Sequence, residues 1–320
     1  MGKLFTIARN TFTEAIRQPV YAAIIFTALL LIFLSPSLTM YTMSDDNKLL
    51  RELGLSTLFL AGLFVAIFSA SGAVAEEIEN KTITTVMTKP IPRPVFIIAK
   101  FLGVFAAIIL AHYICTIGLL MAIRHGVLTS ASDPHDWTVI AAAAAATGLT
   151  LILTAFFNYI YDWKFSSTAM VMLAFFATIS VVFLAFIDRD WKFNPAGNGI
   201  NTSDVYGSIL LLLAMSVIAA LAVAFSARFN TVITLCLCLG IFLLGLISAY
   251  IFSRFADQHL WAKAGEILVP NLQVFWISDA IYEGNPVPLK YLYIVASYAI
   301  CYSAGILSLA IAAFQRRQLG

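Results

Sequence analysis

The stretch SASGAVAEEIENKTITTVMTKPIPRPVFIIAK, residues 69–100, joins two long apolar runs and holds the densest charge in the chain. Its charged residues are Glu76, Glu77, Glu79, Lys81, Lys89, Arg93 and Lys100. Because proline lacks the backbone N–H and clashes with the preceding turn, a helix that begins near Glu76 must end before Pro90. The acidic residues then fall in its first turn, where the helix dipole favours negative charge. The stretch therefore predicts a short charged helix, a proline-rich strap, and a membrane helix that enters near Val95. We expect Lys100 to open that membrane helix and to extend its ammonium toward the lipid headgroups.

Composition indicates a membrane protein. Hydrophobic residues make up 61% of the 320 residues, charged residues make up only 11%, and the mean hydropathy is +0.92. Several apolar runs exceed the roughly 20 residues that a helix needs to cross a bilayer. The formal net charge is only +2 and no block rich in Lys and Arg occurs, so nucleic acid is not expected as a partner.

Eight apolar segments are long enough to span the membrane. Their approximate bounds are 20–40, 55–75, 95–122, 138–158, 166–187, 206–226, 231–252 and 290–314. Residues 1–19 precede them, and apolar side chains recur there at helical spacing, namely Phe5, Ala8, Phe12 and Ile16. This pattern predicts an amphipathic helix that lies in the membrane surface. Residues 20–320 are expected to form a single transmembrane domain.

An even number of spans places both termini on one side of the membrane. Eleven of the 19 Lys and Arg residues lie on the side of the N-terminus, so the positive-inside rule predicts cytoplasmic termini and a cytoplasmic loop 76–94. We therefore expect a multi-pass protein of the cell membrane (plasma or inner). The long outer segment 253–289 is apolar and contains Trp and Tyr, which predicts short helices that dip into the outer leaflet. A cap on the bundle and a substrate gate are equally compatible with that segment.

The predicted spans contain almost no ionisable groups, and His112 is the main exception. Because buried charges in a membrane mark proton relays and ion sites, their scarcity disfavours an ion-coupled carrier and an intramembrane hydrolase. His112 is interpreted as a hydrogen-bonded core residue. The four cysteines, Cys115, Cys236, Cys238 and Cys301, lie in apolar runs and are interpreted as small buried side chains.

Motifs for enzymatic chemistry are missing from the sequence. It contains no G-x-x-x-x-G-K-[ST] phosphate loop, no H-E-x-x-H and no G-x-S-x-G, so no ATP site, cofactor or metal is expected. The cluster Asp133-Pro-His135-Asp136 offers possible metal ligands, but a solvated turn is the preferred interpretation. The chain itself is therefore not expected to be an enzyme.

The segment EEIENKTITTVMTKPIPRPVFIIAKFLG, residues 76–103, resembles the first cytoplasmic loop of type-2 ABC transporter permeases. The matching residues are Glu76 and Glu77 for an acidic pair, Pro90 and Arg93 for a turn, and Lys100 with Gly103 for the start of the third span. The N-terminal surface helix and the apolar outer segment also fit the layout of that family. The family usually has six spans, so either the pair 138–187 or the pair 206–252 is additional. The pair 206–252 directly precedes the outer segment, where the family's fourth and fifth spans are expected, so 138–187 would then be additional; the reverse assignment stays open.

The resemblance implies an all-α polytopic fold like that of type V ABC exporters, with a separate ATPase as the energy source. It implies two permease copies, as a homodimer or heterodimer in membrane lipid, and two ATPase subunits. The helix at 76–88 would sit in a groove on the ATPase, and the predicted coupling residues are Glu76, Glu77, Glu79, Lys81, Thr82, Pro90 and Arg93. The uncharged interior favours an amphiphilic or lipid-linked substrate. A membrane anchor without transport activity and an ion-coupled secondary transporter are the alternatives.

Overall fold

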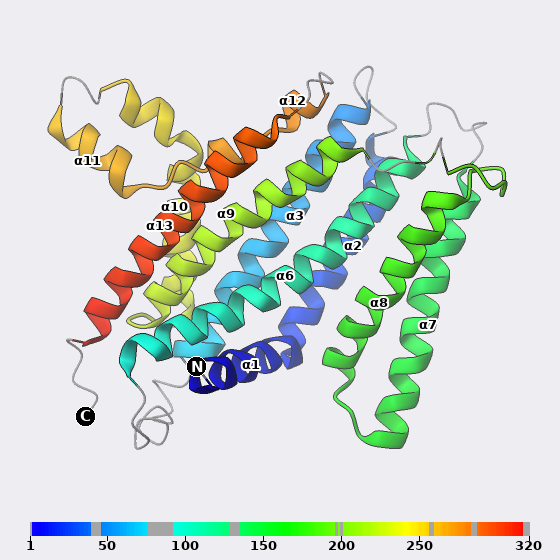
Figure 1. Ribbon diagram of the computed structural model, residues 1–320, viewed down its shortest axis with the longest axis horizontal. Coiled ribbons are helices and arrows are strands. Elements are labelled where there is room, and N and C mark those ends of the chain that lie inside the picture. Colours follow the sequence, from blue (N-terminus) through cyan, green and yellow to red (C-terminus); the bar gives the residue numbers. More distant parts are fainter. Residues whose placement is uncertain are drawn as a thin grey trace.

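The computed structural model describes residues 2–39, 46–75, 92–127, 135–195, 198, 201–255, 259–282 and 287–315. Within these ranges the chain is almost entirely helical, and the only strand pairing is an isolated β-bridge between Ile187 and Phe193. Figure 1 shows the long helices inclined together, with the start of the first helix and the end of the last helix at the lower end of the bundle.

Among the described residues, eight helices are long and apolar enough to cross a membrane. They are α2 (Pro19–Thr39), α3 (Asp46–Ala70), α6 (Arg93–His125), α7 (Trp137–Tyr161), α8 (Phe165–Phe186), α9 (Thr202–Ser226), α10 (Thr231–Ser248) and α13 (Leu289–Gln315). Two of them continue as π-helical turns, η1 (Ser71–Ala75) after α3 and η2 (Ala249–Ser253) after α10. The predicted all-α polytopic fold with eight spans is confirmed.

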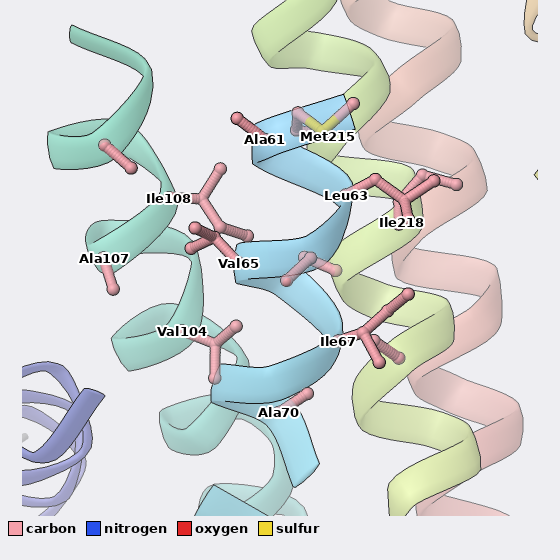
Figure 2. Close-up of a cluster of buried hydrophobic side chains, with 14 of the residues drawn as sticks. Ala61, Leu63, Val65, Ile67, Ala70, Val104, Ala107, Ile108, Met215 and Ile218 are labelled. Carbon is pink, nitrogen blue, oxygen red and sulfur yellow. The ribbon is translucent and has the colours of Figure 1, made fainter. Parts of the chain in front are cut away.

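Helices α3 and α9 form the centre of the bundle, packed against each other and against α6. Within the most apolar stretch of each, 67% of the residues are buried, against 28% in α7 and in α8. In Figure 2, Val65 of α3 faces Ile108 of α6, while Leu63 and Ile67 extend toward α9 and Ile218. Because lipid tails are as apolar as these side chains, close packing rather than water exclusion holds the helices together.

Helices α7 and α8 form a hairpin that packs mainly on itself, at the edge of the bundle beside α6 (Figure 1). Its turn is tight, because Asp162 adopts a left-handed conformation with φ 54°. The Asn158 side-chain amide donates to the Trp163 carbonyl oxygen at 2.6 Å, which fixes that turn. Along the helices, Ala142 and Ala146 are buried, and the Ser180 hydroxyl donates to the Ala142 carbonyl at 3.1 Å. The alanine run thus provides the close approach within the hairpin.

Helix α1 (Gly2–Arg17) occupies the segment predicted to lie in the membrane surface, and Figure 1 shows it crossing the lower end of the bundle. Its buried residues are Thr11, Ala15 and Ile16, whereas Phe5 is 69% exposed. Only part of the predicted apolar face of α1 therefore packs on protein. Small residues let α1 approach α6 closely. A Cβ added at Gly103 of α6 would lie 2.6 Å from the Ala8 carbonyl oxygen. Location of α1 in the membrane surface stays a prediction.

The segment between α10 and α13 contains α11 (Leu260–Leu268), a 3-10 turn η3 (Gln273–Phe275) and α12 (Ser278–Tyr282). Three tyrosines of α13 fix it by hydrogen bonds. Tyr291 and Tyr302 each donate a hydroxyl at 2.6 Å, to the Val274 and Leu268 carbonyls respectively. The Tyr298 hydroxyl accepts from the Asn271 backbone N–H at 2.9 Å. The segment is thus bound to the last span along much of its length.

Burial of the four cysteines differs from the prediction. Cys115 and Cys238 are buried, as expected, but Cys236 and Cys301 are exposed on the outer surfaces of α10 and α13. An apolar run does not distinguish a core-facing position from a lipid-facing one, because both are dry. The prediction that all four are buried is therefore wrong for two of them.

Candidate functional site

Six of the seven predicted coupling residues lie outside the described residues. These six are Glu76, Glu77, Glu79, Lys81, Thr82 and Pro90. Arg93 is described, and it is the first residue of α6, directly after the helix cap Pro92. The structure therefore defines the two attachment points of the loop, at η1 and at the start of α6, and both lie at the lower end of the bundle in Figure 1.

The chain enters the loop through η1, which is firmly held. Ser71 is 1% exposed and Val74 is fully buried, and η1 packs against α1, α6, α9 and α10. Contact with Gln18, the residue between α1 and α2, is especially close, since a Cβ added at Gly72 would lie 2.3 Å from its side-chain nitrogen. Single π-helical turns occur frequently at functional sites. A displacement of the loop at this end would therefore act directly on α3 and its neighbours.

The chain leaves the loop at the start of α6, which is joined to the end of α13. The Arg93 guanidinium donates to the Phe314 carbonyl oxygen at 3.5 Å. The Phe96 and Phe314 rings stack with centroids 6.0 Å apart. Lys100 neither opens the helix nor extends to the surface, so that prediction is wrong. It is 3% exposed, and its ammonium lies 5.5 Å from the centroid of the Phe96 ring, where a cation–π contact stabilises it.

A cluster of charged residues occupies the opposite end of the bundle. The Arg51 Nε of α3 pairs with the Asp204 carboxylate of α9 at 2.9 Å. Arg124, in the last turn of α6, lies 3.7 Å from the Asp136 carboxylate and donates to the Ile187 carbonyl at 2.6 Å. It also donates to the Leu184 carbonyl of α8. These groups line a cavity of about 350 Å³. Sequence reasoning missed the cluster because its ion-pair partners come from different helices.

Asp136 has a structural role in that cluster. Its carboxylate accepts from the Thr138 and Val139 backbone N–H groups at 3.1 and 3.2 Å, which caps α7. No group of three or more potential metal ligands occurs in the part of the chain that the structure describes, a part that excludes Asp133. Nearby, Asp188 accepts from the Arg189 backbone N–H and the Asn194 side chain, and these bonds hold the pKa of its carboxyl below the usual value of 3.8.

A second cluster lies in the interior of the bundle, around His112. Its Nε2 lies 2.9 Å from both the carbonyl oxygen and the hydroxyl of Ser208 on α9. The same hydroxyl lies 2.7 Å from the Thr116 hydroxyl. The Tyr113 and Thr178 hydroxyls form a separate bond of 2.6 Å between α6 and α8. The prediction of a hydrogen-bonded His112 is confirmed, although its partner could not be named from the sequence.

Comparison with known proteins decides the family. A family model described as "ABC-2 family transporter protein" matches residues 5–161. The chain belongs to the ABC-2 family. The match extends from α1 through α7 and so includes the loop that carries the sequence resemblance. No curated protein matches the sequence. Subunits of the ABC-2 family are membrane permeases that are generally not catalytic themselves, that associate with an ABC ATPase and that typically dimerise.

Proposed function

We propose that this ABC-2 permease is the membrane half of an exporter driven by a separate ATPase, with two copies of each subunit. The main support is the attachment of loop 76–94, which carries the family resemblance, to the most buried helices of the bundle. The loop follows η1 at the end of α3 and precedes α6, and α3 packs against α6 and α9. A partner that moved the loop would therefore move the centre of the bundle.

Transmission through these helices has a simple physical basis. A packed core does not deform continuously, so a displacement at one end of a helix appears as a rigid shift along its length. Fully buried side chains line α3 and η1 from Leu63 to Val74, and Val104 and Ile108 of α6 are also fully buried. The predicted charged helix at 76–88 would contact the ATPase, with Glu76 and Glu77 bonded to cationic or N–H groups of that partner.

Orientation in the cell membrane is supported by the arrangement of the ends. α1, the end of α13, the α7–α8 turn and the α9–α10 turn all lie at the lower end in Figure 1. Exposed basic residues of this end include Lys3, Arg9, Arg17, Lys164 and Arg228, but others, such as Arg189, Lys192 and Lys263, are exposed at the opposite end. The support is therefore the count over the whole sequence, in which 11 of the 19 Lys and Arg residues fall on the side of the N-terminus. Because cytoplasmic segments are enriched in Lys and Arg, we assign this end, with both termini and loop 76–94, to the cytoplasm. The charged cavity around Arg124 then faces outward.

The position of the α7–α8 hairpin supports its assignment as the additional pair of spans. α9, α10 and α13 pack with α3 and α6, whereas α7 contacts little besides α8. Removal of the hairpin would leave α2, α3, α6, α9, α10 and α13 as a six-span bundle, the number usual in the family. The scarcity of charge inside that bundle supports an amphiphilic or lipid-linked substrate.

The double change Glu76→Ala with Glu77→Ala tests the coupling assignment. A matched control, Glu52→Ala with Asp190→Ala, removes two carboxylates from the opposite end of the molecule. Charge-assisted contacts at a desolvated interface are worth about 1.5–3 kcal/mol each. We therefore expect the loop variant to lose the ATPase subunit during co-purification, or to retain it without ATP-driven transport. The control should retain both, and both variants should unfold at the wild-type temperature.

Two outcomes would contradict the proposal. If the loop variant co-purifies with the ATPase and transports as well as the control, the Glu76 and Glu77 carboxylates only face solvent and do not contact the ATPase. A wild-type permease that captures no ATPase from its native membrane would favour the alternative of an anchor without transport activity.

A further inference from the structure

The cavity of about 350 Å³ around Arg124 lies where several of the candidate spans end. Arg124 is in the last turn of α6, Asp204 is in the first turn of α9, and Asp136 caps the start of α7. The ends of spans mark the level at which the hydrocarbon of a bilayer gives way to the lipid headgroups. The cavity is therefore at headgroup level, at the end of the bundle opposite the attachment of loop 76–94 (Figure 1).

Charged side chains of both signs line this cavity, and their formal charges cancel. Among the described residues of the lining they are Arg51, Arg124, Arg189, Asp136, Asp188 and Asp204. Asp136 and Asp204 are buried, and each is paired with an arginine of the same lining. A ligand with a net charge would leave that charge without a counter-ion in the cavity. The lining therefore favours a ligand that is neutral overall but carries polar or charged groups.

Two arginines of the cavity have N–H donors from which no described residue accepts. Arg189 is exposed, and its side chain makes no hydrogen bond to the described residues. Arg51 uses its Nε and one terminal nitrogen for the Asp204 carboxylate, at 2.9 and 3.5 Å, which leaves the other terminal nitrogen without an acceptor in the described part of the chain. Guanidinium groups present their donors in a planar fork that fits the oxygens of a phosphate. These two side chains therefore favour a phosphate group as ligand.

Asp188 provides a place for a cationic group beside that phosphate. It accepts one bond from the Arg189 backbone N–H at 2.7 Å and one from the Asn194 side chain at 3.2 Å. Because a carboxylate can accept about four hydrogen bonds, Asp188 retains capacity for an ammonium donor. Arg189 and Asp188 are adjacent in the chain and both line the cavity, which suits a phosphate and an ammonium that are only a few bonds apart.

A second cavity, of about 330 Å³, adjoins the charged one and is mostly apolar. It follows the seam between α6, α8 and α9, and it shares Leu120 and Val181 with the charged cavity. No Lys, Arg, Asp or Glu is among the described residues that line it. Val182 of α8 also lines this seam and is 53% exposed, so the seam reaches the lipid-facing surface. A lipid chain can therefore enter the seam from the bilayer.

The seam has the depth of one lipid leaflet. Along α6 its lining runs from Ile109 to Leu120, which is about 16 Å at 1.5 Å per residue. Half of a hydrocarbon core of roughly 30 Å is about 15 Å. A charged cavity at headgroup level, joined to an apolar seam of this depth, has the shape of a single phospholipid molecule.

We propose that the protein binds one zwitterionic phospholipid here, with its phosphate on Arg189 and Arg51, its ammonium at Asp188 and an acyl chain in the seam. Phosphatidylethanolamine is the simplest lipid of this class. A soluble zwitterionic phosphate would offer the same polar groups, but it would leave the apolar seam unused. Binding needs only the permease, so this site goes beyond the proposed transport and is tested without it.

The test measures lipid binding to the purified full-length permease by native mass spectrometry, without any ATPase. The probes are phosphatidylethanolamine, phosphatidylglycerol and diacylglycerol with identical acyl chains. We expect phosphatidylethanolamine to bind about tenfold more tightly than diacylglycerol, which lacks the phosphate, as for one charge-assisted hydrogen bond. Phosphatidylglycerol, a net anion, should bind more weakly than phosphatidylethanolamine. Equal binding of phosphatidylethanolamine and diacylglycerol, or tighter binding of phosphatidylglycerol, would overturn the proposal.

Glycerophosphoethanolamine, the same headgroup without acyl chains, separates the two possible sources of the ligand. At the concentration of the lipid it should not displace bound phosphatidylethanolamine, because it gains nothing from the seam. Displacement at equal concentration would mean that the cavity binds a soluble zwitterion and would contradict the lipid assignment.

Two variants of one loop test the headgroup contact. Arg189→Gln and Lys192→Gln each remove one positive charge, but Lys192 is an exposed residue that does not line the cavity. We expect Arg189→Gln to weaken phosphatidylethanolamine binding about tenfold at an unchanged unfolding temperature, and Lys192→Gln to bind as wild type. Equal affinities of the two variants, whether both are weakened or both are unchanged, would exclude Arg189 as the phosphate ligand.

Two variants of α8 test the position of the acyl chain. Val182→Trp fills the seam from the lipid side, whereas Val171→Trp makes the same change at a residue that is 49% exposed and does not line the seam. We expect the first to weaken binding of phosphatidylethanolamine and of diacylglycerol about tenfold, because both lipids use the seam, and the second to change neither. Equal lipid affinities of the two variants would contradict the placement of the chain between α6, α8 and α9.

Discussion

The central pair α3 and α9 and the peripheral hairpin α7–α8 have similar hydropathy and different surroundings. All four helices are apolar enough to span a membrane, yet the share of buried residues in the central pair is more than double that in the hairpin. The central helices are held by interlocked side chains such as Leu63 and Ile218 (Figure 2). The hairpin is held by its own pairing and by polar contacts near its ends. Apolarity therefore identifies a span, and packing decides its place in the bundle.

The largest expected effect breaks the central packing. Ile218→Ala on α9 removes a fully buried side chain and should lower the free energy of unfolding by about 2–5 kcal/mol. Ile152→Ala on α7 makes the same change where the side chain is 66% exposed, and should stay within about 0.5 kcal/mol of wild type. Thermal unfolding of both variants in the same detergent measures the difference. Equal destabilisation would mean that the hairpin is as tightly packed as the centre.

A smaller effect is expected where the hairpin is attached. Arg124→Gln removes the guanidinium that bonds the carbonyls at the end of α8 and faces the buried Asp136. The carbonyls at the end of α8 and the Asp136 carboxylate then lose their donor. We therefore expect the free energy of unfolding to fall by about 1.5–3 kcal/mol. Hydrogen exchange should rise over 180–190 and remain unchanged in α3.

Arg189→Gln is the control for that change, since Arg189 is an exposed arginine of the adjacent loop whose side chain makes no hydrogen bond to the described residues. It should leave hydrogen exchange at the end of α8 unchanged. If both variants loosen α8 equally, net charge rather than the Arg124 bonds holds the hairpin in place.

Sequence reasoning predicted the spans well, but it did not predict which of their side chains are buried against protein. Length and apolarity fix a membrane helix because every backbone group must be bonded within it, so the eight spans could be read directly. A long helix that starts at Arg93 places Lys100 in its second turn, where α6 is already surrounded by protein. The cation–π contact that accommodates Lys100 joins residues one turn apart, but the segments that bury Lys100 are distant in the sequence.

The candidate sites show the same limit. The proposed coupling loop was predicted from local charge and proline spacing, which a sequence displays directly. The His112–Ser208 bond joins residues 96 positions apart, and the Arg51–Asp204 pair joins residues 153 positions apart. Neither follows from a pattern within one helix. A polar residue inside a span indicates only that a partner is needed, and the packing of α6 on α9 supplies it.

The smallest expected effect is that of a Gly→Ala change, which should alter stability in opposite directions in the two regions. Gly103 of α6 and Gly148 of α7 both lie inside helices, where Ala is favoured over Gly by up to about 1 kcal/mol. A Cβ at Gly148 meets nothing within 4 Å, so Gly148→Ala should stabilise the protein by roughly that amount. A Cβ at Gly103 would lie 2.6 Å from both the Ala8 carbonyl oxygen and the Thr11 Cβ, and backbone cannot rotate away. Gly103→Ala should therefore destabilise by about 1 kcal/mol or more, with α1 displaced from α6 and faster hydrogen exchange over 2–17. Thermal unfolding of the two variants gives the sign, and hydrogen exchange gives the location. Stabilisation by both changes would show that α1 rests only loosely on α6, as a helix bound mainly to lipid would.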